Sequence, residues 1–326
     1  MSPRTRIRAV VALAALAAAG IAVGAALHGR AQNGDSSTTV KRGPPPLELS
    51  VLVGNDAEAR ALRAAERTYD RGARAAAERQ FRGLATRYPS SVEAAVGSAI
   101  AEWPEHTLEK LRSLANQHPD SALVRLHLGL ALYSAGQDKA ATAQWLEAKR
   151  REPDSPSALR AEDLLHPDMA PGRPFFFPAS AAPPAIVKLP PAEQLQELRR
   201  AAARGDAEEN LLYGVALQRI GRPVSALAAF DHALAVEPQS VAAQVAAAVG
   251  RFDKDEPAAA FSRLGPLARA HPRAAVVRFH LGLLLLWIRD VKDARTQLQR
   301  AADVDRRGFY GREARGLLSR LELVGT

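Results

Sequence analysis

Apolar residues recur at three- and four-residue spacing through most of the chain after residue 55, in segments of roughly 11–16 residues. Proline or glycine separates these segments, and Asp or Ser often stands at their starts, as is typical of helix ends. The spacing predicts an all-α chain of short amphipathic helices with essentially no β-sheet. Alanine dominates the periodic segments, which favours close packing of helix on helix.

The predicted helices form pairs with a common internal spacing. In three pairs, a glycine of the first helix is followed, at the same intervals, by a small, a large and another small residue of the second helix. These sets are Gly129, Ala141, Trp145 and Ala148; Gly214, Ala226, Phe230 and Ala233; and Gly282, Ala294, Leu298 and Ala301. The glycine lets the partner helix come close, and the large side chain fills the gap between them.

The residues that follow the second helix of each pair also repeat at a fixed distance. Pro153 and Pro238 follow two of the pairs at the same distance, and Arg306 stands at that place in the third. These positions resemble the tetratricopeptide repeat, a helix–turn–helix unit of about 34 residues. Weaker units fit the same register, so the resemblance covers most of residues 55–153 and 206–305. It implies an α-α superhelix of helix pairs.

The units repeat as two halves. Residues 118–130 return at 271–283 with the same His-Pro start and the same His-Leu-Gly-Leu end. We therefore expect two duplicated lobes of three pairs and a closing helix each, at 55–166 and 192–326. An additional helix opens the second lobe, and its closing helix caps the C-terminus. A Pro/Phe-rich linker, residues 167–191, separates the lobes.

Three consecutive phenylalanines, Phe175–Phe177, stand inside this linker. A solvated linker rarely carries such a run, because each exposed ring forfeits about 1.5–3 kcal/mol of burial. We therefore expect the segment to dock against a lobe.

The N-terminus has the features of a membrane segment. Residues 9–27 are uncharged and apolar or small, and three arginines precede them. As a helix the run would span about 28 Å, close to the roughly 30 Å of a bilayer core. It predicts a single transmembrane helix within residues 1–30, with a cytoplasmic N-terminus and an extracytoplasmic body. Cleavage as a signal sequence, which would release a secreted body, remains the alternative. Residues 31–54 read as a flexible, proline-containing tether.

Composition narrows the functional classes. The chain has no cysteine, which excludes disulfides, thiolate catalysis and Cys-ligated metal. Its net charge is +9, of which four arginines within residues 1–30 supply +4, and the modest remainder predicts no nucleic-acid binding. No phosphate-binding glycine loop, nucleophile elbow or HExxH motif occurs. We expect no enzyme activity, no cofactor, no metal site and no small-molecule substrate.

The repeated histidines His127 and His280 are expected to be packed residues, because no second metal ligand recurs beside them. First helices line the inner surface of such an array. In peptide-binding members of the family, Lys, Arg and Asn there clamp a carboxylate, whereas the corresponding positions of this chain are largely apolar. The candidate partner-binding residues are Leu126, Leu130, Tyr133, Leu211, Val215, Gln218, Arg219, Phe279, Leu283 and Trp287.

The apolar groove has two possible occupants. An apolar or helical segment of a partner could lie in it. The chain's own Phe175–Phe177 or residues 47–53 could fill it instead, which we favour because large exposed apolar patches are rare.

Together these patterns predict a non-catalytic scaffold, tethered to a membrane through residues 9–27, that binds another protein or a peptide segment during assembly of an envelope complex. The alternative is an accessory or catalytic component that acts on cell-envelope polymer. An acidic or histidine cluster opening into the groove would favour that alternative, and the sequence supplies none.

Overall fold

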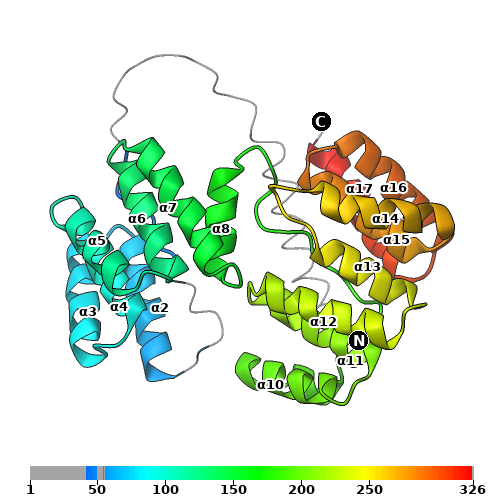
Figure 1. Ribbon diagram of the computed structural model, residues 1–326, viewed down its shortest axis with the longest axis horizontal. Helices are drawn as coiled ribbons and strands as arrows, with labels where there is room; N and C mark the ends of the chain where they lie inside the picture. Colours follow the sequence, from blue (N-terminus) through cyan, green and yellow to red (C-terminus); the bar gives the residue numbers. More distant parts are fainter. Residues whose placement is uncertain (1–41, 50–53, 55, 325–326) are drawn as a thin grey trace. The chain divides into compact units, whose positions relative to one another are not determined.

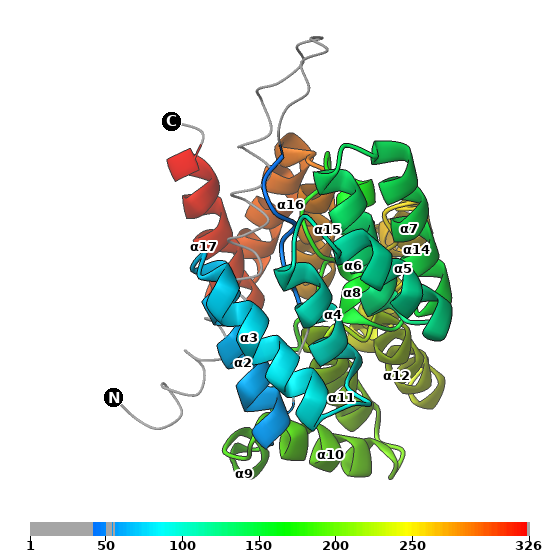
Figure 2. The ribbon, with the colours of Figure 1, turned by 90° about the vertical axis from the view of Figure 1, so that its left-hand side faces the viewer.

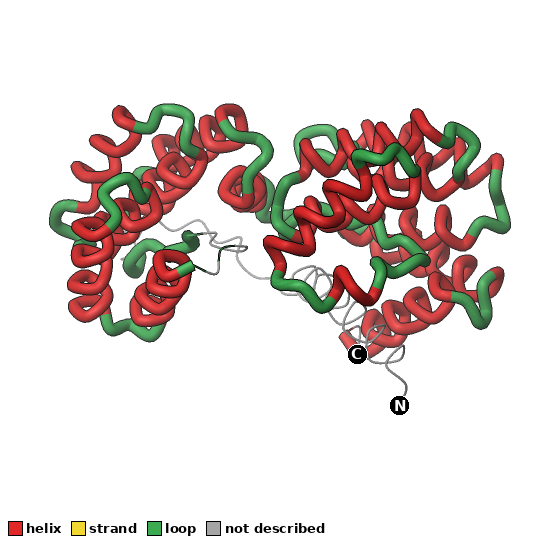
Figure 3. Tube along the Cα trace, turned by 90° about the horizontal axis from the view of Figure 1, so that it is seen from below, coloured by secondary structure: helices red, strands yellow, loops and turns green. Residues whose placement is uncertain are grey.

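The computed structural model describes residues 42–49, 54 and 56–324. These residues form sixteen helices and no strand (Figures 1 and 3), which confirms the all-α prediction for this part of the chain. Contacts divide the chain into two compact units, with the boundary between Leu165 and His166. We call the described residues up to 165 the first unit and residues 166–324 the second unit.

The first unit contains three helix pairs and a closing helix. Its helices are α2 (Ala57–Asp70), α3 (Arg74–Arg87), α4 (Val92–Ala101), α5 (Thr107–Gln117), α6 (Ala122–Ser134), α7 (Asp138–Arg151) and α8 (Pro156–Leu165). Figure 2 shows the first pair, α2 and α3, side by side. The closing helix α8 packs against both members of the third pair.

The second unit repeats this order after two leading helices. Its helices are α9 (Pro184–Val187), α10 (Pro191–Ala202), α11 (Ala207–Arg219), α12 (Pro223–Val236), α13 (Val241–Gly250), α14 (Ala258–Ala270), α15 (Ala275–Trp287), α16 (Val291–Val304) and α17 (Phe309–Val324). The pairs are α11–α12, α13–α14 and α15–α16, and α17 closes the unit. The additional helix before the pairs is α10, whereas the four-residue α9 was not predicted.

Serine residues cap the N-termini of three of the first helices, α4, α6 and α13. The hydroxyl groups of Ser91, Ser121 and Ser240 each accept a hydrogen bond from the backbone N–H three residues further on. The first N–H groups of a helix lack intrahelical partners, so each cap stabilises its helix by about 1 kcal/mol. Ala274, which stands where the first unit has Ser121, makes no such bond.

The predicted contacts between glycine and a large residue hold the pairs together. A Cβ added at Gly129 or Gly214 would overlap the ring of Trp145 or Phe230, and one at Gly282 would lie 2.9 Å from Leu298 Cγ. The partner helices therefore approach too closely to accept any side chain at these positions. This packing confirms the pair geometry expected from the spacing.

No helix in the described residues is both long enough and apolar enough to cross a membrane. The segment predicted as an anchor, residues 1–30, lies outside the described residues, and of the predicted tether only residues 42–49 and 54 are described. The anchor therefore stays a prediction.

Candidate functional site

The Phe-rich segment is part of the core of the second unit. Phe176 is completely buried, and Phe177 is 9% exposed. The Phe176 ring stacks on His280 with 5.0 Å between ring centroids and meets Phe230 edge-on at 5.7 Å. The expected docking against a lobe is therefore observed, and residues 175–178, which we call the second strap, fill the inner face of this unit.

Side chains, not a neighbouring strand, satisfy the backbone of the second strap. The Phe176 N–H donates to Gln218 Oε1 at 3.1 Å, and the Phe177 N–H donates to His280 Nε2 at 2.9 Å. The Tyr310 hydroxyl donates to the Phe177 carbonyl at 2.9 Å. Because a buried backbone group without a partner is costly, these bonds allow a non-helical segment to lie in an apolar groove.

The first unit holds residues 45–49, which we call the first strap, in the same way. The Glu48 N–H donates to His127 Nε2 at 3.1 Å, and the Tyr69 hydroxyl donates to the Pro45 carbonyl at 2.7 Å. The side chains on either side of Glu48, those of Leu47 and Leu49, are 4% and 2% exposed. Each unit therefore binds a non-helical segment through a histidine acceptor and a tyrosine donor.

Polar contacts fix the first strap along its length. The Leu49 N–H donates to Glu66 Oε1 at 2.8 Å, and burial raises the pKa of this carboxyl group. Arg160 pairs with Glu48 at 2.9 Å. Just before the strap, Arg42 forms an ion pair with Asp138, and its guanidinium carbon lies 3.9 Å from the centre of the Tyr133 ring.

The two repeated histidines are neutral acceptors. Nδ1 lies 2.8 Å from the Leu123 carbonyl oxygen in His127 and 2.7 Å from the Val276 carbonyl oxygen in His280. A carbonyl can only accept, so Nδ1 carries the proton and Nε2 is free to accept the strap N–H. Complete burial lowers the pKa of each histidine to about 4. The prediction that these are packed residues is confirmed.

The ten residues predicted to bind a partner have two different environments. Eight are buried, so they do not form an open groove: Leu126, Leu130, Leu211, Val215, Gln218, Phe279, Leu283 and Trp287. In the second unit, the second strap and the residues just before it cover two of these side chains. Gln218 accepts a hydrogen bond from the Phe176 N–H, and the Trp287 indole donates to the Gly172 carbonyl at 2.9 Å. Tyr133, which is 44% exposed, and Arg219 are accessible. Contact with a partner stays a prediction for all ten.

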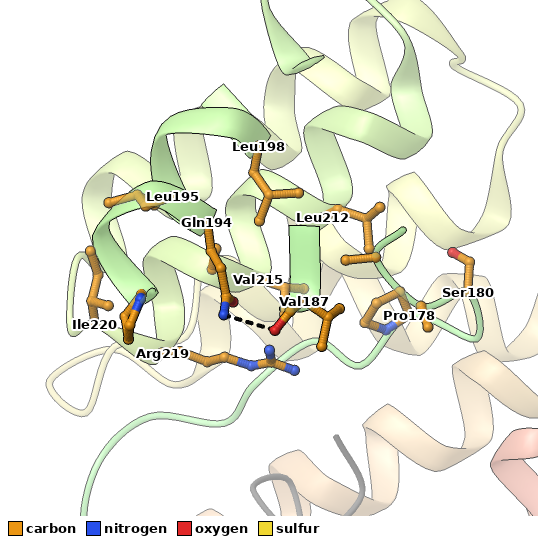
Figure 4. Close-up of a pocket in the computed structure, with 14 residues that line it drawn as sticks. Pro178, Ser180, Val187, Gln194, Leu195, Leu198, Leu212, Val215, Arg219 and Ile220 are labelled. Atoms are coloured by element: carbon orange, nitrogen blue, oxygen red, sulfur yellow. Dashed lines mark hydrogen bonds between the residues drawn. The ribbon is translucent and has the colours of Figure 1, made fainter. Parts of the chain in front are cut away.

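The second unit also has an open pocket (Figure 4). It lies between α9, α10, α11 and residues 178–182, and its volume is about 270 Å³. Val215 and Arg219, both predicted as partner-binding residues, lie in its wall. The other lining side chains are mostly apolar. Among the described residues, no cluster of three or more His, Asp or Glu side chains could hold a metal ion.

The sequence matches no protein-family model and no curated protein. Similar solved structures include a human IFIT1 dimer with PPP-AAAA, at 16% identity over 77% of this chain and 59% of that one, with a TM-score of 0.33. A tetratricopeptide repeat protein from Parabacteroides merdae is 12% identical over 81% of this chain and 98% of that one, with a TM-score of 0.34. Yeast Tom70 is 14% identical over 94% and 69%, with a TM-score of 0.32.

The chain therefore spans about three fifths of the IFIT1 chain. At these TM-scores, the repeat assignment rests on the packing within each helix pair rather than on the superpositions. The described residues form tetratricopeptide-like helix pairs, and the chain is similar to tetratricopeptide repeat proteins, as the spacing of its glycine and large apolar positions predicts.

Proposed function

We propose that the chain is a non-catalytic scaffold that binds another protein through its tetratricopeptide-like units. One observation carries the proposal. Both units bind a non-helical peptide segment, with a buried histidine accepting a backbone N–H and a tyrosine hydroxyl donating to a backbone carbonyl. These groups contact the main chain, so they suit a partner segment as well as the chain's own strap.

The first unit is the place where a partner segment would replace a strap. The segment leading into the first strap is held by the ion pair of Arg42 with Asp138, whose carboxylate is 58% exposed, and such surface pairs stabilise weakly. The first strap itself is held by the buried Leu47 and Leu49, whereas the second strap is held by the larger, fully buried Phe176 ring. Tyr133, which contacts Arg42, is the accessible candidate residue beside the segment that leads into the first strap.

The scaffold works at a membrane in this proposal. Residues 9–27 anchor it, the N-terminus is cytoplasmic, and the two units lie on the extracytoplasmic side, where they take part in assembly of an envelope complex. The support is the apolar run itself and the arginines that precede it. A fluorescent reporter fused after Thr326 tests the location. Cytoplasmic fluorescence together with protease resistance in intact cells would contradict it.

Site-specific photocrosslinking in cells tests binding. A photoreactive residue at position 133 is expected to give one specific protein adduct, because this side chain contacts Arg42 in the segment that leads into the first strap. Leu146, 52% exposed on α7 of the same unit, is the matched control position. Loss of the Arg42 ion pair, in Arg42→Gln, is expected to increase the adduct at position 133. No adduct there, or the same adducts at both positions, would refute the proposal.

A further inference from the structure

Hydrogen bonds within the protein hold the walls of the pocket in the second unit. On one side, the Gln194 side chain donates to the Val187 carbonyl at 3.2 Å (Figure 4). It also donates to the Leu189 carbonyl at 2.6 Å and thereby fixes the connection between α9 and α10. On the other side, the wall includes Pro178, the last residue of the second strap, whose Phe177 is bonded to His280 and Tyr310. The pocket is therefore pre-formed, as small-molecule sites usually are.

The lining of the pocket is apolar with a single charge. Its large apolar side chains are those of Val187, Leu195, Leu198, Leu212, Val215 and Ile220, and its polar side chains are those of Ser180 and Gln194. Arg219 is the one charged residue in the lining. Figure 4 shows its side chain running along the wall, with the guanidinium group below Val187 in that view.

Arg219 lacks a counter-ion within the described part of the chain. Arg173 and Arg251 of the same unit pair with Asp253 and Asp231, at 2.7 and 2.8 Å, whereas no carboxylate of the described residues pairs with Arg219. Burial lowers the pKa of its guanidinium, which still remains charged at neutral pH. Arg219 stands in the last turn of α11, and the partial negative charge of the helix end offsets only part of a full cation.

We propose that this pocket binds a medium-chain carboxylate, with the carboxylate on Arg219 and the alkyl tail between α10 and α11. A guanidinium group presents paired N–H donors that match a carboxylate, and the exposed Arg219 side chain is accessible to such a head group. The volume of about 270 Å³ lies near the lower limit of ligand pockets, roughly 300 Å³, so the tail is short. This site adjoins the second strap, because Pro178 lines it, but it does not include the groove that holds Phe176 and Phe177. It differs from the expectation that no small molecule binds.

Calorimetric titration of the full-length protein with octanoate tests the site. Octanoate is expected to bind saturably at one site. Acetate, which keeps the head group and lacks the tail, is expected to bind more than about 100-fold more weakly, because each buried methylene contributes several-fold in affinity. Octyltrimethylammonium, which keeps the tail and reverses the charge, is expected not to compete. Acetate binding as tightly as octanoate, or no saturable octanoate binding, would overturn the proposal.

Variants then assign the interaction to its residues. Arg219→Gln is expected to weaken octanoate binding by about 10- to 100-fold, since it removes a charge-assisted bond. Arg200→Gln is the matched control, because Arg200 lies on α10, pairs with Glu197 and is absent from the lining. Ala216→Trp should fill the pocket and abolish binding, and Leu212→Trp serves the same purpose if the first variant does not fold. Equal affinities for Arg219→Gln and the wild type would refute the assignment.

Discussion

Replacing Phe176 by alanine removes the side chain that ties the second strap to the core of the second unit. The ring is completely buried, stacks on His280 and packs edge-on against Phe230. Truncation of a buried phenylalanine costs about 3–5 kcal/mol, and full burial between two rings places Phe176→Ala near 4 kcal/mol. For a unit of this size, the midpoint of thermal unfolding should fall by about 10 °C.

Phe175→Ala is the matched control, because it makes the same chemical change one residue earlier. Phe175 is only partly buried, with its ring centroid 6.4 Å from that of Phe177, so we expect a loss of about 1–2 kcal/mol. Urea unfolding gives both free energies, and hydrogen exchange read by mass spectrometry assigns the loss to a unit. Equal losses for the two variants, or a loss of protection centred on the first unit, would refute the proposed role of the strap.

Two further perturbations test the packing and the histidines. Gly214→Ala should destabilise the second unit by about 1–3 kcal/mol in urea unfolding, because a Cβ there overlaps the Phe230 ring, whereas Gly316→Ala on α17, where nothing lies within 4 Å, should stabilise it by about 0.5–1 kcal/mol. Two losses of equal size would contradict the close-approach explanation. Lowering the pH should destabilise both units, because the unfolded chain takes up protons below about pH 6.5 while His127 and His280 stay neutral down to about pH 4. The expected loss between about pH 7 and pH 5 is about 2 kcal/mol per histidine, and urea midpoints that stay constant over this range would contradict it.

The helix pairs are readable from the sequence because their packing rule is periodic. Gly129, Gly214 and Gly282 each face a large residue of the next helix at the same interval. The pattern therefore predicts both the helices and the contact between the glycine and the large side chain. The burial of Phe175–Phe177 is equally readable, since three adjacent rings need an apolar surface. Helix α9 could not be predicted in this way, because it has only four residues and no apolar period.

The hydrogen bonds of the straps could not be predicted in the same way. The bond from Phe177 to His280 joins residues 103 positions apart, and the bond from Glu48 to His127 joins residues 79 apart. The repeated histidines indicate packed positions, yet their acceptor role depends on which segment the fold brings to them. Tyr69 and Tyr310 carry no pattern that marks them as donors.

The pocket could not be predicted from the sequence either. Arg219 is among the predicted partner-binding residues because of its place on a first helix, but its position in a pocket wall arises from the packing of α9 and α10 beside α11. A tertiary arrangement of this kind leaves no local spacing in the chain.

The bond between each buried histidine and a strap amide can be observed directly by ¹⁵N NMR of the uniformly labelled protein at neutral pH. Both His127 and His280 should carry their proton on Nδ1, and each Nε2 should show a coupling across the hydrogen bond to one amide, that of Glu48 or Phe177. Protonated Nε2 atoms, or strap amides that exchange with water as fast as an unfolded peptide, would contradict the self-occupied grooves on which the proposed scaffold rests.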